Sequence, residues 1–176
     1  MSFKVSLVGH SQLPGGIHLS QVDLRTYRSP GARADSFYEN GTLCEVLEWP
    51  HDLCILWIGS NDIEQHSVPA EITNNIVGIV QTIEEATNAI VWVVKLEHRF
   101  YQEGGPVTQT DYRKIQRGVN KKLESRLSNR LINFNSEMWV ELMGEDGVHW
   151  SQEGKQKIRK RFRKLIREFM ECSDSE

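Results

Sequence analysis

Long hydrophobic runs are absent from this sequence of 176 residues. No apolar stretch approaches the roughly 20 residues that a helix needs to cross a bilayer. The N-terminus also lacks the basic segment, long apolar segment and small-residue cleavage site of a secretory signal. These absences favour an intracellular protein of the cytoplasm over a membrane or secreted one.

Cysteine is scarce as well. The chain has three cysteines, Cys44, Cys54 and Cys172. An odd number without the spacing of metal ligands indicates reduced thiols in a reducing compartment. No histidine spacing suggests a metal site either, and this holds for His18, His51, His66 and His98. We therefore expect no metal site, and the chemistry that the loop residues below suggest needs no organic cofactor either.

Charge is nearly balanced overall but not locally. Residues 155–167 carry eight Lys or Arg and no acid, so a net charge of −3 leaves the rest of the chain at −11. This basic segment has two interpretations. It is the solvated face of an amphipathic helix, or it contacts the phosphates of nucleic acid or of an anionic membrane.

The length and an ordinary composition, 39% hydrophobic and 26% charged, fit one domain over residues 1–172 with a disordered tail at 173–176. Strands and helices alternate, which predicts an α/β fold of three layers around a five-stranded parallel sheet. The expected strands are 4–9, 22–27, 53–58, 89–96 and 131–134. The expected helices are 34–48 in two pieces around Gly41, 71–86, 111–128, a turn at 139–143, and 151–171.

Four polar clusters fall in the expected loops, and three of them directly follow a strand. They are Gly9-His10-Ser11, Pro30-Gly31, Gly59-Ser60-Asn61-Asp62 and Asp146-Gly147-Val148-His149. Loops that follow parallel strands share one edge of the sheet, so residues far apart in sequence can converge there. We expect Asp62 to brace the Asn61 loop rather than take part in chemistry.

The residue types in these clusters suit ester hydrolysis by a serine. Ser11 is a candidate nucleophile, His149 a base for its proton, and Asp146 the carboxylate that fixes the tautomer of the imidazole. Donors for an oxyanion are available from the backbone N–H groups of Ser11 and Gly31 and the side-chain amide of Asn61.

These blocks resemble the SGNH hydrolases, the GDSL-type esterases and lipases, whose four motifs centre on Ser, Gly, Asn and His in that order. The resemblance spans nearly the whole chain and implies a flavodoxin-like fold and a serine esterase. It implies Ser11 as nucleophile, Gly31 and Asn61 completing an oxyanion hole with Ser11, and His149 as a base held by Asp146. The sequence lacks the second glycine of the G-x-S-x-G elbow of α/β-hydrolases.

One position departs from the pattern: His10 stands where the family has the Asp of Gly-Asp-Ser, which usually supports the nucleophile turn. We prefer His149 to His10 as the base, because adjacent side chains diverge. Glu97-His98-Arg99 follows a strand, and we interpret it as a solvated loop rather than a pocket rim. Trp150 either walls an acyl pocket or packs in the core, and we favour packing.

The small size leaves little chain for a lid, so we expect an open site, a small acyl-ester or lipid substrate and short acyl groups, acetyl first. A weaker similarity to the esterase domain in first-frame proteins of LINE-type retrotransposons implies an alternative. There the domain is an interaction module of a nucleoprotein particle with little or no esterase activity, and residues 155–167 touch nucleic acid or membrane.

Overall fold

The computed structural model describes residues 2–65, 67–101 and 104–173. Five strands form one parallel sheet in the order β2-β1-β3-β4-β5, the flavodoxin-like order. Their bounds are β1 (Phe3–Gly9), β2 (Val22–Arg28), β3 (Leu53–Trp57), β4 (Ile90–Val94) and β5 (Leu131–Ile132). The expected α/β class and parallel sheet are confirmed.

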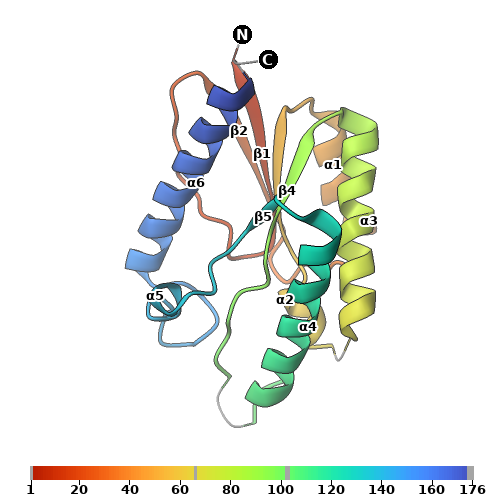
Figure 1. Cartoon of the computed structure of the whole chain (residues 1–176), viewed down its shortest axis with the longest axis vertical. Helices are drawn as coiled ribbons and strands as arrows, with labels where there is room; N and C mark the ends of the chain where they lie inside the picture. The colour runs from red at the N-terminus through yellow and green to blue at the C-terminus, as the bar shows by residue number, and fades with distance from the viewer. Residues whose placement is uncertain (1, 66, 102–103, 174–176) are drawn as a thin grey trace.

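Helices cover both faces of the sheet (Figure 1). α5 and α6 lie on one side, and α1, α3 and α4 lie on the other. The helices are α1 (Thr42–Glu48), α2 (Ser60–Ile63), α3 (Pro69–Thr87), α4 (Gln109–Leu127), α5 (Glu137–Val140) and α6 (Gln152–Ser173). In the part of the chain that the structure describes, no helix is long and apolar enough to span a bilayer.

The core consists of two apolar layers divided by the sheet. Successive residues of a strand point to opposite faces, so Leu7 and Ile55 pack toward α6, and Val8 and Leu56 pack toward α1, α3 and α4. All five residues of β3 are buried, as its unbroken apolar run predicts for a central strand.

The region 34–48 differs from our prediction. Only its second piece is a helix, α1, and residues 34–40 form turns. The backbone N–H groups of Ala34 and Asp35 donate to the carboxylate of Asp62 instead of entering a helical ladder. A long-range contact therefore overrides local helix propensity there.

The final helix begins where expected, because Ser151 Oγ accepts from the N–H of Gly154 at 3.1 Å. Its apolar stripe of Ile158, Phe162 and Ile166 is fully buried. α6 continues to Ser173, the first residue of the expected tail, and residues 174–176 lie outside the described part.

Candidate active site

The exit from β1 is fixed by a glycine. Gly9 has φ +153°, and a Cβ at this position would lie 2.0 Å from the carbonyl oxygen of Trp57 on β3. No other residue fits this close approach of two backbones. The chain leaves the sheet there and presents Ser11, half-buried, at the carboxyl edge of the strands.

The structure brings Ser11 and His149 together although 138 positions separate them. Ser11 Oγ lies 3.3 Å from His149 Nε2, and His149 Nδ1 lies 2.7 Å from Asp146 Oδ2. The other oxygen of Asp146 accepts from the backbone N–H groups of Val148 and His149, at 3.0 and 2.8 Å. Serine, imidazole and carboxylate therefore form one continuous chain of contacts.

The charge of Asp146 determines which nitrogen of the His149 ring carries the proton. Partial burial acts to raise the pKa of this carboxyl, but the hydrogen bonds from His149 and Val148 outweigh it and lower the pKa to about 2. Asp146 is therefore an anion at neutral pH and holds a proton on Nδ1 of His149. That tautomer leaves Nε2 as an acceptor for the Ser11 hydroxyl.

The loop that carries Asp146 and His149 is held tightly from outside. Gly147 has φ +66°, and a Cβ there would lie 2.2 Å from the carbonyl oxygen of Phe100. The Phe100 N–H donates to the Gly147 carbonyl at 2.7 Å, and the Gln12 side-chain amide donates to the Val148 carbonyl. The imidazole is thus positioned by the residue next to Ser11 as well as by its own loop.

Two further predicted site residues lie side by side. Asn61 Nδ2 donates to the carbonyl oxygen of Ala32, the neighbour of Gly31, at 2.9 Å. A carboxamide nitrogen carries two hydrogens, so one remains for a ligand. Gly31 is exposed with φ +74°, in a turn closed by the Ala32 N–H donating to the Ser29 carbonyl at 3.0 Å.

Asp62 braces this pair, as predicted. Its two oxygens accept from the backbone N–H groups of Ala34 at 2.8 Å and Asp35 at 3.2 Å. Burial raises the pKa of Asp62 to about 6, against the opposing effect of these two hydrogen bonds. The segments around Gly31 and Asn61 are thereby tied together at two points.

No protein-family model matches the sequence, and no curated protein matches it. Solved structures do. A family 3 carbohydrate esterase from Talaromyces cellulolyticus matches with a TM-score of 0.73 and 16% identity, over 96% of this chain and 99% of that one. A lipolytic G-D-S-L family protein from Veillonella parvula matches at 0.62 and 15% identity, over 88% and 93%. A longer protein from Bacillus subtilis matches with a TM-score of 0.67 and 16% identity. The match covers 91% of this chain and 55% of the Bacillus subtilis chain.

This chain has the SGNH hydrolase fold. His10, which lies between Gly9 and Ser11, is completely buried. Its Nδ1 accepts from the N–H of Gln12 at 3.3 Å, so the imidazole supports the turn around Ser11. Its Nε2 lies 3.9 Å from Oε1 of Glu97. His10 faces inward and does not compete with His149 for Ser11.

Glu97 and Arg99 were misread from the sequence as parts of a solvated loop, and both are buried. Glu97 Oε2 accepts from Trp57 Nε1 at 2.9 Å and from Ser60 Oγ at 2.8 Å. Glu97 Oε1 accepts from Arg99 Nε at 3.0 Å. The available signal was a pair of opposite charges two positions apart after a buried strand, since that spacing points both side chains the same way.

Arg99 connects this ion pair to Asn61. Its Nη1 donates to Asn61 Oδ1 at 3.0 Å and to Glu64 Oε1 at 2.7 Å. Burial disfavours the charges of both Glu97 and Arg99, but their mutual attraction prevails, lowering the pKa of Glu97 and raising that of Arg99. A permanent cation therefore holds the oxygen of the Asn61 carboxamide, which leaves its NH₂ group directed toward Ala32.

Trp150 packs in the core, as favoured above. It is 3% exposed, and its ring lies 6.4 Å from that of Trp57 and 6.2 Å from that of Trp139. Trp150 therefore anchors the backbone directly after His149 in the core.

We predict that His10 makes the protein less stable in acid. Burial, with smaller contributions from Arg99 and His149 and against the opposing effect of Glu97, lowers the pKa of His10 to about 4, whereas an unfolded histidine titrates near 6.5. Between these values the unfolded state binds a proton that the folded state does not, so the free energy of unfolding falls as the pH is lowered through this window. The full loss is about 3 kcal/mol.

Urea unfolding from about pH 7 to about pH 4 measures this effect. His10→Asn flattens the acid-side slope, whereas His18→Asn, at an exposed histidine, keeps that of the wild type. If the free energy of unfolding depended on pH equally in wild type and His10→Asn, the prediction would be contradicted.

Proposed function

We propose that this protein is a serine esterase that hydrolyses short-chain carboxylic esters, acetyl esters first, through an acyl-enzyme. One observation carries the proposal: Ser11 Oγ lies 3.3 Å from an imidazole whose far nitrogen is held 2.7 Å from an ionised carboxylate. This is the arrangement in which a serine hydroxyl becomes a nucleophile. The likeness of the fold to esterases and lipolytic proteins supports the same chemistry.

The proposed reaction has two halves. Ser11 Oγ attacks the ester carbonyl while His149 Nε2 takes its proton, and Asp146 stabilises the imidazolium. The oxyanion is held by the N–H groups of Ser11 and Gly31 and the free Nδ2 hydrogen of Asn61. Collapse expels the alcohol, which receives the proton from His149. A water molecule, deprotonated by His149, then attacks the acyl carbonyl. His149 returns this proton to Ser11 Oγ as the acid leaves, which regenerates the free serine.

The exposure of the catalytic groups supports small, accessible acyl groups. The side chains of His149 and Asp146 are 50% and 54% exposed, so the site lies near the surface rather than in a deep apolar tunnel. A long acyl chain gains most from enclosure by apolar walls, whereas an acetyl group needs little. Because one structural neighbour is named a carbohydrate esterase, acetylated sugars are the first natural substrates to test.

Hydrolysis of para-nitrophenyl acetate tests this proposal. Ser11→Ala and His149→Ala abolish turnover above background, because nucleophile and base act as a unit. Asn61→Ala loses less, on the order of 10²–10³ in kcat, as expected for one oxyanion donor. Ser20→Ala, at an exposed serine in the loop after Ser11, is the matched control and keeps wild-type activity. Equal rates in wild type and Ser11→Ala would overturn the proposal.

We further predict that Arg99 positions Asn61. Arg99→Lys keeps the charge but cannot reach Glu97, Glu64 and Asn61 together, so kcat falls about tenfold while KM changes little. The same substitution in an Asn61→Ala background has almost no further effect on kcat, because there is no carboxamide left to orient. An equal loss in both backgrounds would show that Arg99 acts only through stability.

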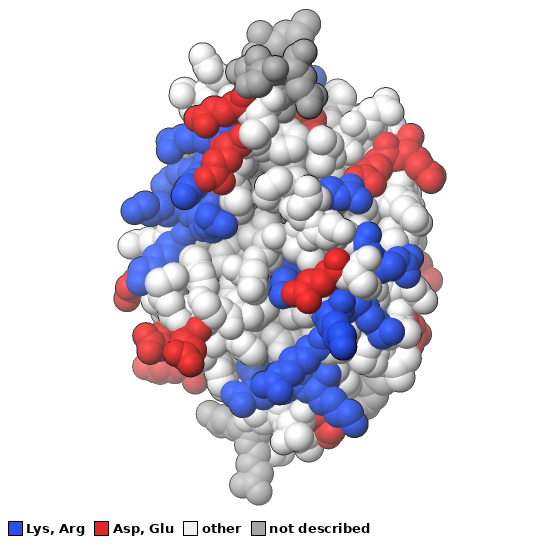
Figure 2. Space-filling view, in the orientation of Figure 1, with Lys and Arg blue, Asp and Glu red and all other residues white. Residues whose placement is uncertain are grey.

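The basic segment on α6 favours a second candidate, binding of single-stranded nucleic acid. Figure 2 shows its Lys and Arg residues gathered along one flank of the molecule. The apolar face of α6 is buried against the sheet, so it has no apolar stripe to insert into a bilayer, and phosphates on a nucleic acid suit it better than a membrane surface. The neighbours reported above do not bear on the similarity to retrotransposon proteins.

Salt-dependent binding of a single-stranded oligonucleotide tests this second candidate. Combined replacement of the exposed Lys160, Arg161 and Arg167 by Ser weakens binding and lowers the salt slope by about 2. Lys157 and Lys164 already pair with Glu153 and Glu168, so their replacement by Ser has a smaller effect. Unchanged affinity in the triple variant would refute this role, whatever the esterase assay shows.

A further inference from the structure

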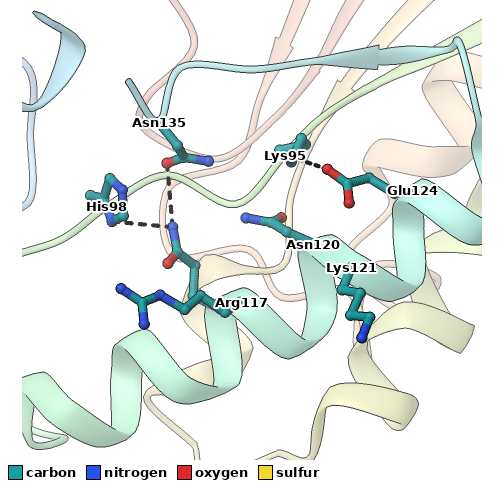
Figure 3. A pocket seen from close by; sticks show the side chains of 8 residues that line it. Lys95, His98, Arg117, Asn120, Lys121, Glu124 and Asn135 are labelled. Carbon is teal, nitrogen blue, oxygen red and sulfur yellow. Dashed lines mark hydrogen bonds and ion pairs between the residues drawn. The ribbon is translucent and has the colours of Figure 1, made fainter. Parts of the chain in front are cut away.

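A cavity of about 510 Å³ lies beside α4 (Figure 3). α4 contributes Gln116, Arg117 and Lys121, the segment after β4 contributes Lys95 and His98, and Asn135 follows β5. Its volume falls within the roughly 300–1,000 Å³ of small-molecule sites, and it exceeds what a lone inorganic ion needs.

The cavity holds cations that have no acidic partner. Its one acid, Glu124, is occupied by Lys95, whose Nζ lies 2.6 Å from Glu124 Oε1. Within the described residues, neither Arg117 nor Lys121 forms an ion pair. These two lie four positions apart on α4, where like charges repel each other. Figure 2 shows a broad positive surface over α4. An anion bound there would relieve the repulsion, and a phosphate matches such cations well.

The inner wall offers an acceptor rather than another donor. The side-chain amides of Gln116, Asn120 and Asn135 all donate to the Leu96 carbonyl at 2.9 Å. Gln116 Nε2 also lies 3.5 Å from His98 Nδ1 and 3.3 Å from Asn135 Oδ1, so this nitrogen has no hydrogen left for a ligand. Gln116 is only 1% exposed, and its Oε1 has no hydrogen-bond partner in the described chain. A buried acceptor without a partner costs about 1–3 kcal/mol, so a ligand with a hydrogen-bond donor fits this wall.

His98 adds a flat and uncharged ring to the cavity. Burial, reinforced by the neighbouring guanidinium groups of Arg113 and Arg117, lowers the pKa of His98 from 6.5 against smaller opposing effects. In Figure 3, His98 and Asn135 lie on one side of the space and Arg117 and Lys121 on the helix across it. The cavity thus combines a cationic rim, an aromatic ring and one deep acceptor.

We propose that this cavity binds a nucleoside monophosphate, with its phosphate against Arg117 and Lys121 and a base N–H donating to Gln116 Oε1. A nucleotide supplies an anion, a planar ring system and an N–H donor in one molecule. The proposal uses neither Ser11 nor the cations of α6, so it stands or falls separately from ester hydrolysis and from nucleic-acid binding by that helix.

The test is a titration at constant ionic strength with the four ribonucleoside 5′-monophosphates, ribose 5-phosphate and inorganic phosphate. Binding is followed by the NMR signals of the Gln116 side-chain amide. At least one nucleotide binds about tenfold more tightly than ribose 5-phosphate and shifts these signals, because the base adds a hydrogen bond and ring contacts. Equal binding of nucleotide, ribose 5-phosphate and phosphate, or no nucleotide binding, would overturn the proposal.

A matched pair of double variants locates the site. Arg117→Ser with Lys121→Ser lowers nucleotide affinity about tenfold or more, since both phosphate contacts are lost. Lys122→Ser with Arg126→Ser removes the same charge from exposed positions of α4 outside the cavity and changes affinity by less than about twofold. Equal losses in both would show a general electrostatic effect and refute the site. Ser11→Ala keeps the wild-type affinity, so this result is independent of the esterase assay.

Discussion

A single buried carboxylate organises the carboxyl edge of the sheet. Glu97 accepts hydrogen bonds from Trp57 at the end of β3, from Ser60 at the start of α2 and from Arg99 beyond β4, and it faces His10 beyond β1. The segments that follow three strands therefore meet on one group. An uncompensated charge at such a depth would cost several kcal/mol. The hydrogen bonds and the guanidinium of Arg99 offset that cost and hold these loops in register.

The same carboxylate accounts for the unusual residue before the proposed nucleophile. An Asp at position 10 would bring a second carboxylate close to Glu97, and two like charges in a dry site cannot both stay ionised. Histidine avoids this conflict, because burial keeps it neutral while its Nδ1 still accepts from the backbone N–H of Gln12. The turn therefore keeps its internal support although the chemical type of the supporting side chain has changed.

The sequence allowed the main architecture to be predicted because its signals are local. The apolar run of β3 and the stripe of α6 each reflect burial of one element, and the loops after parallel strands must meet at one edge. That rule brings the segments of Ser11, Gly31 and Asn61 together, because each follows a strand. The pairing of Ser11 with His149 was predicted from their residue types and from the resemblance to SGNH hydrolases, since residues 146–149 follow a helix. The structure around Ala34 could not be predicted in the same way, since its N–H groups bond to Asp62 across 28 positions. Arg99 was missed for a similar reason, because only the folded chain shows the carboxamide it holds.

The half-open setting of Asp146 and His149 bears on the second half of the proposed reaction. Half of the His149 side chain is open to solvent, while its Nε2 contacts Ser11 Oγ. In the proposed reaction, a hydrolytic water would therefore need no dedicated channel to reach His149. The same openness would admit other hydroxyl compounds to an acylated Ser11, so the proposed acyl-enzyme would pass its acyl group to dissolved alcohols as well as to water.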